Sequence, residues 1–413
     1  MDRFCDVIVE EILRCLPAKY LHRVRATARR YNLIILSPGF VSRYWESHAP
    51  YLSGVFLQSN RPWRQHSRFL TGSGGRPSAT ESMFAADLAF MPTVPPGRAA
   101  SDREIFIVHA TAGLLLCSRG KYMPVKYYVC NPVTWQWVAL PDLPWPPEYM
   151  SGLLSVTNNG DGRIIRFQVV LFNHPRHWNR FGGGCLDLKV FSSVTGLWEA
   201  KHIWPPTSID VMACGSNFLG QSGTAYWIGY NPMDRLIAYN CLHHTIQVLP
   251  LPGRVHDTKT ALNRCIGERE AGVLRYAHFD CSVFQVWDLH ANNINGTWWK
   301  LVHQVGVMEL AERNPEATAL VTKPENVECR INATSESSLF SLLGFHPTAD
   351  IIYLDINHNV GAYSIEHGTI TYQCPDTYFH DDVFPYVHPA HPVEIPAIKK
   401  TPLLPLKRRC HFS

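Results

Sequence analysis

The sequence predicts an α+β multidomain protein, in which a small N-terminal helical module precedes an all-β propeller of about six blades. Three observations support this fold class. Apolar residues recur at helical spacing only before about residue 48, short β-rich runs separated by turn residues follow, and one apolar hairpin pattern recurs. The predicted boundaries are 1–48 for the helical module, 51–398 for the propeller and 399–413 for a basic C-terminal tail.

Composition excludes several classes of protein. The chain has 413 residues, more than one compact core usually holds, and 46% of them are hydrophobic and 17% charged, as in folded globular proteins. A net charge of +4 disfavours a dedicated nucleic-acid binder. The 12 cysteines form no Cys-x-x-Cys motif, so we expect reduced thiols. Because the N-terminus lacks a signal-peptide pattern and no apolar run approaches the roughly 20 residues of a membrane span, we expect a cytoplasmic and/or nuclear protein without membrane contact.

The helical module begins with an amphipathic helix. Its apolar face follows the spacing i, i+3, i+4 and i+7 at Val9, Ile12, Leu13 and Leu16, and Pro17 ends it. The same spacing predicts a second helix across Leu21, Val24, Ala28 and Tyr31, and a third that begins after Ser37-Pro38. Three apolar faces in so short a segment exceed what the segment can bury, so we expect another surface to cover part of them.

The propeller prediction rests on a recurring hairpin. The stretch YYVCNPVTWQWVALP, Tyr127–Pro141, has two apolar runs around an Asn-Pro turn, and one such hairpin cannot be stable alone. Looser copies occur at Lys189–Ile203, Leu236–Pro252, Phe284–Val305 and Val360–Tyr372. Two of the intervals are about 48 residues, a spacing typical of propeller blades. A sandwich of two face-packed sheets is the alternative.

Two further expectations follow from the repeat. Tyr51–Pro92 is expected to hold a degenerate first blade, and the tryptophans Trp137, Trp198 and Trp299 are expected to pack at similar places in successive blades. The sequence has neither repeated Trp-Asp dipeptides nor regularly spaced glycine pairs, so it is not a typical WD-repeat or kelch protein.

The first segment, FCDVIVEEILRCLPAKYLHRVRATARRYNLIILSPGFVSRY, resembles an F-box, the helical module that recruits the adaptor subunit of SCF-type ubiquitin ligases. The matching residues are Asp6, Ile8, Ile12, Leu13, Leu16 to Lys19, Leu21, Val24, Arg25, Arg29, Ile34, Ile35, Ser37, Pro38 and Phe40. The chain departs from the family at Phe4-Cys5, where Leu-Pro is usual, and at Tyr31, where tryptophan is usual. The remainder resembles the F-box-associated, kelch-like propellers of plants, through YVCNPVTWQWVALP, VFSSVTGLW and FQVWDL with GTWWKL.

This resemblance implies a substrate-recognition subunit of an SCF-type ubiquitin ligase, which binds the adaptor, and through it the cullin, by the F-box and an unknown target by the propeller. No catalytic residue and no cofactor is then expected in this chain. The residues expected to bind the adaptor are Phe4, Cys5, Ile8, Val9, Ile12, Leu13, Leu16, Pro17, Leu21 and Val24. The alternatives are a propeller scaffold with a degenerate F-box and, less favoured, a propeller enzyme.

Other candidate sites are weaker. The segment Phe172–Gly184 mixes aromatic residues, arginines and glycines, so Arg176, Trp178 and Arg180 are the expected target contacts. His243 and His244 are adjacent, but no cysteine or carboxylate accompanies them at metal-ligand spacing, and we expect no metal. The run of basic residues between Lys19 and Arg30 fits a solvated face or an acidic protein surface better than nucleic acid.

Overall fold

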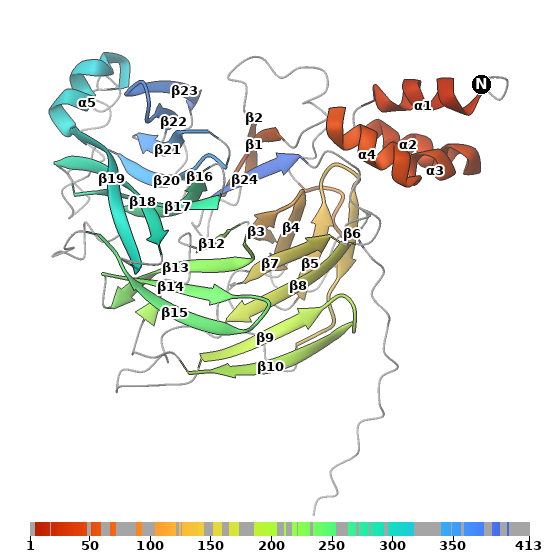
Figure 1. Ribbon diagram of the computed structural model, residues 1–413, viewed down its shortest axis with the longest axis horizontal. Helices are drawn as coiled ribbons and strands as arrows, with labels where there is room; N and C mark the ends of the chain where they lie inside the picture. Colours follow the sequence, from red (N-terminus) through yellow and green to blue (C-terminus); the bar gives the residue numbers. More distant parts are fainter. Residues whose placement is uncertain are drawn as a thin grey trace, which may run out of the picture.

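The structure is a computed structural model, and it contains a helical module and a β-propeller (Figure 1). The residues that it describes are 5–16, 18–47, 51–58, 67–71, 88–92, 104–120, 124, 126–143, 152–158, 165–172, 186–204, 210–211, 217–220, 222–231, 234–252, 263–269, 272–280, 282–292, 296–317, 340–347, 349–356, 359–375, 382–388 and 395.

Four helices, not the expected three, form the N-terminal module. They are α1 (Asp6–Arg14), α2 (Ala18–Thr27), α3 (Arg29–Ile35) and α4 (Pro38–Ser47). The expected second helix is split because Ala28 has an extended backbone (φ −155°, ψ 140°), which separates α2 from α3. At α4 the expected N-terminal cap is present, since the Ser37 hydroxyl accepts a hydrogen bond from the Phe40 N–H at 3.3 Å.

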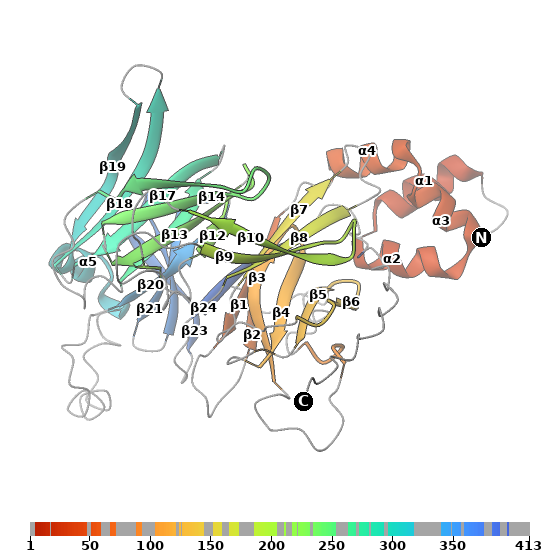
Figure 2. The ribbon, with the colours of Figure 1, turned by 90° about the horizontal axis from the view of Figure 1, so that it is seen from below.

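Six antiparallel sheets follow in a ring, beside which the helices lie (Figures 1 and 2). Blade 1 contains β3 (Ile105–Thr111), β4 (Leu114–Arg119), β5 (Lys126–Asn131) and β6 (Gln136–Ala139). Blade 2 contains β7 (Leu153–Asn158), β8 (Ile165–Phe172), β9 (Leu186–Ser192) and β10 (Leu197–Ile203). Blade 3 contains β11 (Asp210–Val211), β12 (Asn217–Leu219), β13 (Thr224–Asn231), β14 (Arg235–Asn240) and β15 (Thr245–Pro250).

The chain then continues around the ring. Blade 4 contains β16 (Arg264–Arg269), β17 (Val273–Phe279), β18 (Val283–Asn292) and β19 (Gly296–Gly306), and the helix α5 (Val307–Arg313) follows it. Blade 5 contains β20 (Ser341–Phe345), β21 (Ile351–Ile356), β22 (Asn359–Ser364) and β23 (Thr369–Pro375). The remaining sheet, which we call the closing sheet, has the order β2-β1-β24, with β1 (Tyr51–Gln58), β2 (Ser67–Thr71) and β24 (Asp382–His388).

The expected count of about six blades is wrong, because only five sheets have the four strands of a complete blade among the described residues. The segment expected to form a degenerate first blade supplies β1 and β2 instead, and the third strand of the closing sheet comes from the other end of the chain. Its register pairs Phe56 of β1 with Phe384 of β24. The ring is therefore closed by hydrogen bonds between the first and last strands.

The hydrophobic core is divided among the spaces between neighbouring sheets. One cluster joins blades 1 and 2, for example through Leu116 and Val169, and another joins blades 4 and 5 through Phe284 and Tyr363. Equivalent clusters join blade 2 to blade 3, blade 3 to blade 4, and the closing sheet to blades 1 and 5. Each sheet is thus covered on both faces by its neighbours, which is propeller packing and not the packing of a two-sheet sandwich.

Two side-chain amides tie neighbouring sheets together at backbone bulges. Gln58 of the closing sheet donates to the Ile107 carbonyl oxygen at 3.1 Å and accepts from the Ile107 N–H at 2.7 Å. Asn263 bonds blade 5 in the same way, at Phe340 and Leu342. In both cases the bonded inner strand has a bulge, at which ladder hydrogen bonds are interrupted. The amides satisfy backbone groups that the sheet leaves unpaired.

The tryptophan expectation is correct for two residues and wrong for the third. The indole N–H of Trp198 donates to the Pro141 carbonyl oxygen at 2.9 Å, and that of Trp299 donates to the Pro250 carbonyl oxygen at 2.7 Å. Both prolines lie at the end of the preceding blade's outer strand. Trp137 is 41% exposed instead. The sheet that precedes blade 1 is the closing sheet, which among the described residues has no fourth strand to supply an equivalent acceptor.

The predicted turn at Asn131 has the expected chemistry. The Asn131 side-chain oxygen accepts hydrogen bonds from the N–H groups of Val133 at 2.9 Å and Thr134 at 3.2 Å. Asn240 does the same in blade 3. In blades 1, 2, 3 and 5, the last residue of this turn lies directly before the outer strand and has a positive φ angle. These residues are Trp135, Gly196, His244 and Gly368.

Candidate functional site

The apolar face predicted for α1 is divided between the interior and the surface of the helical module. Val9 and Leu13 are buried, and Leu16 is half-buried beside them. The module core that receives them also contains Leu21, Ile35, Phe40 and Tyr44, with Val24 packed against it. The Tyr44 hydroxyl donates to the Leu16 carbonyl oxygen at 2.9 Å. These residues form the interior of the module, so most of their surface is unavailable to the predicted adaptor.

Three of the predicted adaptor residues, Cys5, Ile8 and Ile12, face outward. Ile8 is 47% exposed and Ile12 is 49% exposed, and their i, i+4 spacing places them next to each other on α1. Cys5 and Cys15 are also exposed and extend the same side of the helix by one turn in each direction. We call this surface the α1 stripe: Cys5, Ile8, Ile12 and Cys15. Phe4 and Pro17 lie outside the described residues.

Ion pairs hold α1 against the rest of the module. Asp6 pairs with Arg30 of α3 at 2.8 Å, and Glu10 pairs with Arg43 of α4. Within α1, Glu11 pairs with Arg14 at 2.8 Å. Surface pairs of this kind contribute little stability individually, but two of them join helices and so fix how α1 is rotated. The α1 stripe is therefore an exposed apolar surface on a helix that ion pairs join to α3 and α4.

The predicted target contacts cannot be placed, because Arg176, Trp178 and Arg180 lie outside the described residues. The basic C-terminal tail also lies outside them. Among the described helices, none is long and apolar enough to cross a membrane. In the same part of the chain, no three histidine, cysteine or acidic side chains are grouped as metal ligands would be. The His244 ring is used otherwise, since its Nδ1 is 2.7 Å from the buried Tyr239 hydroxyl.

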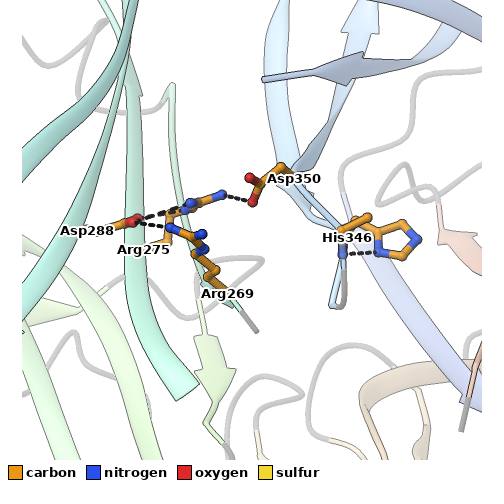
Figure 3. A network of polar contacts seen from close by, with 6 residues as sticks. Arg269, Arg275, Asp288, His346 and Asp350 are labelled. Atoms are coloured by element: carbon orange, nitrogen blue, oxygen red, sulfur yellow. Dashed lines mark hydrogen bonds and ion pairs between the residues drawn. The ribbon is translucent and has the colours of Figure 1, made fainter. Parts of the chain in front are cut away.

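The strongest cluster of charges is structural. The Arg275 guanidinium donates to Asp288 at 2.7 Å and 3.3 Å and to Asp350 of blade 5 at 2.8 Å (Figure 3). Arg269 lies beside Arg275 and approaches the same carboxylate, at 3.5 Å (Figure 3). Burial alone would lower the pKa of Arg275, but the hydrogen bonds and charge of Asp288 raise it, so the arginine stays charged. Every carboxylate in the cluster is paired with an arginine, which leaves none as a ready proton acceptor.

Comparison of the sequence with known protein families identifies the family of this chain. A model of the family described as F-box protein At3g26010-like, beta-propeller, matches residues 88–327. The chain belongs to this family. It is a plant F-box protein with a propeller domain, and the match covers blades 1 to 4, whose inter-blade packing is described above.

Curated relatives agree with the family assignment. The Arabidopsis thaliana F-box protein At5g07610 is 25% identical over 355 residues, which cover 82% of this chain and 77% of the relative. The F-box protein At5g03970 from the same plant is 24% identical over 377 residues, 88% of this chain and 80% of the relative. The F-box protein At3g26010 is 30% identical over 197 residues, 44% of each chain. Solved structures are more distant: the chain described as "Structure of YjhT" has a TM-score of 0.34 at 11% identity, over 64% of this chain and 83% of that one.

Proposed function

We propose that this F-box-family protein is the substrate-recognition subunit of an SCF-type ubiquitin ligase. The helical module binds the adaptor, and through it the cullin, while the propeller holds a target protein for other subunits to modify. The chain itself is then non-catalytic and acts in the cytoplasm and/or nucleus. The observation that supports the adaptor role best is the α1 stripe, an exposed apolar surface on a helix that ion pairs hold in place.

Burial decides which residue of α1 is suitable for a test of adaptor binding. Leu16 packs against the module core, so an aspartate there would also damage the fold of the module. Ile12 is a better choice because half of its side chain is already in solvent. Ile12→Asp should leave the module folded and place an unpaired carboxylate in the adaptor interface, weakening adaptor binding by at least about tenfold. The measurement is adaptor affinity with purified proteins.

The matched control is on the same helix. Val7 is 70% exposed and lies on a different side of α1 from Ile8 and Ile12. Val7→Asp adds the same charge and should keep adaptor affinity near that of the parent protein. Parent-like affinity of Ile12→Asp would place the interface elsewhere on the module. If the parent protein binds no adaptor at all, the departure at Phe4-Cys5 has removed the function and the scaffold alternative applies.

Target binding is proposed for the segment that contains Arg176, Trp178 and Arg180. Buried arginine and tryptophan anchors typically cost about 2 kcal/mol or more each when truncated at the centre of an interface. A triple alanine variant should therefore lose targets that co-purify with the parent protein, as identified by mass spectrometry. Trp204→Ala is the control, since Trp204 is 69% exposed at the end of β10. Retention of every target by the triple variant would show that another surface binds them.

A further inference from the structure

The backbone of Trp135 is in a conformation that tryptophan rarely adopts. Its φ angle is 59°, at the turn position where blades 2 and 5 have Gly196 and Gly368. Glycine occupies the left-handed region without steric cost, whereas a bulky side chain is strained there. A strained residue persists only where the surrounding structure holds it in place, and such residues often have a functional role. The contacts of the Trp135 ring therefore bear on why a tryptophan occupies this position.

The other bulky residue at this turn position has a specific partner. His244, with φ 53°, has its ring nitrogen Nδ1 2.7 Å from the hydroxyl of Tyr239, whose side chain is fully buried. The partner of Trp135 lies in a different part of the protein. The guanidinium carbon of Arg23, in α2, lies 5.7 Å from the centroid of the Trp135 ring, within the range of a cation–π interaction.

The turn that carries Trp135 is held in place by buried residues of blade 1. Asn131 is fully buried and holds the turn by two hydrogen bonds, and Val133 is buried in the cluster between the closing sheet and blade 1. The Trp135 side chain is still 48% exposed, so its ring projects from this turn and contributes little to the propeller core. Figures 1 and 2 both show the helical module beside blade 1, where this turn lies.

We propose that Trp135 is a positioning residue that fixes the orientation of the helical module on the propeller through its contact with Arg23. The left-handed backbone directs the ring toward α2, and the arginine completes the contact from the module side. This inference concerns the geometry between the two parts and stands whether or not the module binds a ligase adaptor. Where it does, the same contact sets the distance between adaptor and bound target.

The test measures the distance between the two parts in the full-length chain. Fluorescent dyes are attached through genetically encoded azido residues at Leu33 of α3, 62% exposed, and Leu242 of the β14–β15 turn, 73% exposed, which avoids the cysteines. The parent protein should give a single narrow transfer-efficiency population. Trp135→Gly removes the ring and suits the backbone, so the variant should fold while its distance distribution shifts or broadens. Arg23→Met, which keeps the side-chain length without the charge, should act in the same direction.

Two controls make the result specific. Trp135→Phe keeps an aromatic face and should retain the parent distribution. Arg29→Met removes an exposed arginine from the same module and should not change the distribution. Adaptor affinity of Trp135→Gly should equal that of the parent, which separates this inference from the proposed function. A distribution for Trp135→Gly that superimposes on that of the parent would overturn the inference.

Discussion

At the scale of single residues, buried side-chain amides account for much of the specific structure. Gln58, Asn131 and Asn263 are almost completely buried, and each bonds backbone groups that no strand neighbour reaches. A buried backbone group without a partner costs more than an ordinary hydrogen bond contributes. Removal of one of these amides should therefore lower the free energy of unfolding by more than the loss of an ordinary hydrogen bond would.

Asn131→Ala is the direct test of this effect. The substitution leaves the N–H groups of Val133 and Thr134 without their acceptor, so we expect the free energy of unfolding to fall by about 1–3 kcal/mol. Urea unfolding should show a lower midpoint with an unchanged slope. Ser192→Ala in blade 2 removes one longer bond, of 3.3 Å, and should cost less. The prediction is wrong if both variants are destabilised equally.

At the scale of elements, the pair Arg275–Asp288 joins β17 to β18, and Asp350 extends the pair to blade 5. The Asp288 side chain is 2% exposed, whereas that of Asp350 is 43% exposed. Breaking a buried pair leaves an uncompensated charge, but an exposed partner is readily replaced by water. The two aspartates therefore contribute unequally although both bind the same arginine.

We expect Asp288→Ala to lower the free energy of unfolding by about 3–5 kcal/mol and Asp350→Ala to lower it by about 1 kcal/mol or less. Both variants can be compared by chemical unfolding at one pH and one salt concentration. Added salt should weaken the Asp350 contribution first, because solvent screens that pair more strongly. Similar losses in the two variants would contradict this account of the cluster.

The sequence predicts those elements whose signals are local. The first helix, the cap at Ser37 and the turn at Asn131 depend on residues a few positions apart, and all three are present. Ala28 could not be predicted as a break, because the apolar spacing continues across it from Leu21 to Tyr31. Helical periodicity placed Ile12 on the same face as Val9 and Leu13, but only packing against α3 and α4 determines which of them reaches solvent. The contact of Trp135 with Arg23 and the amide bridges depend on residues distant in sequence, for which one sequence carries no signal.

At the scale of the whole molecule, an uncharged histidine makes one of the hydrogen bonds that join neighbouring blades. His109 of blade 1 accepts a hydrogen bond at Nδ1 from the Leu154 N–H of blade 2, at 3.3 Å. Burial lowers the pKa of His109 from 6.5 to about 4. The unfolded chain therefore takes up a proton as pH falls below about 6.5, while the folded chain does not until about pH 4. The stability that this residue contributes is present above pH 6.5 and is lost progressively between these values.

From pH 7 to pH 5, protonation of His109 in the unfolded chain should reduce the free energy of unfolding by about 2 kcal/mol. His346, whose pKa burial lowers to about 4, acts in the same direction. His109→Gln should flatten the pH dependence of unfolding by about that amount. Identical pH profiles for the parent protein and His109→Gln would exclude this linkage.

The pairing of β1 with β24 also determines when the ring can form during synthesis. Strand β1 leaves the ribosome early, but its partner is encoded near the other end of the chain. At roughly 5–20 residues per second, translation of the intervening blades takes on the order of tens of seconds, during which one edge of β1 has no partner from its own sheet. An unpaired strand edge is a template for association with other chains. A product that terminates before residue 382 keeps that edge permanently, so premature termination should lead to aggregation or chaperone capture and not to a shortened working protein.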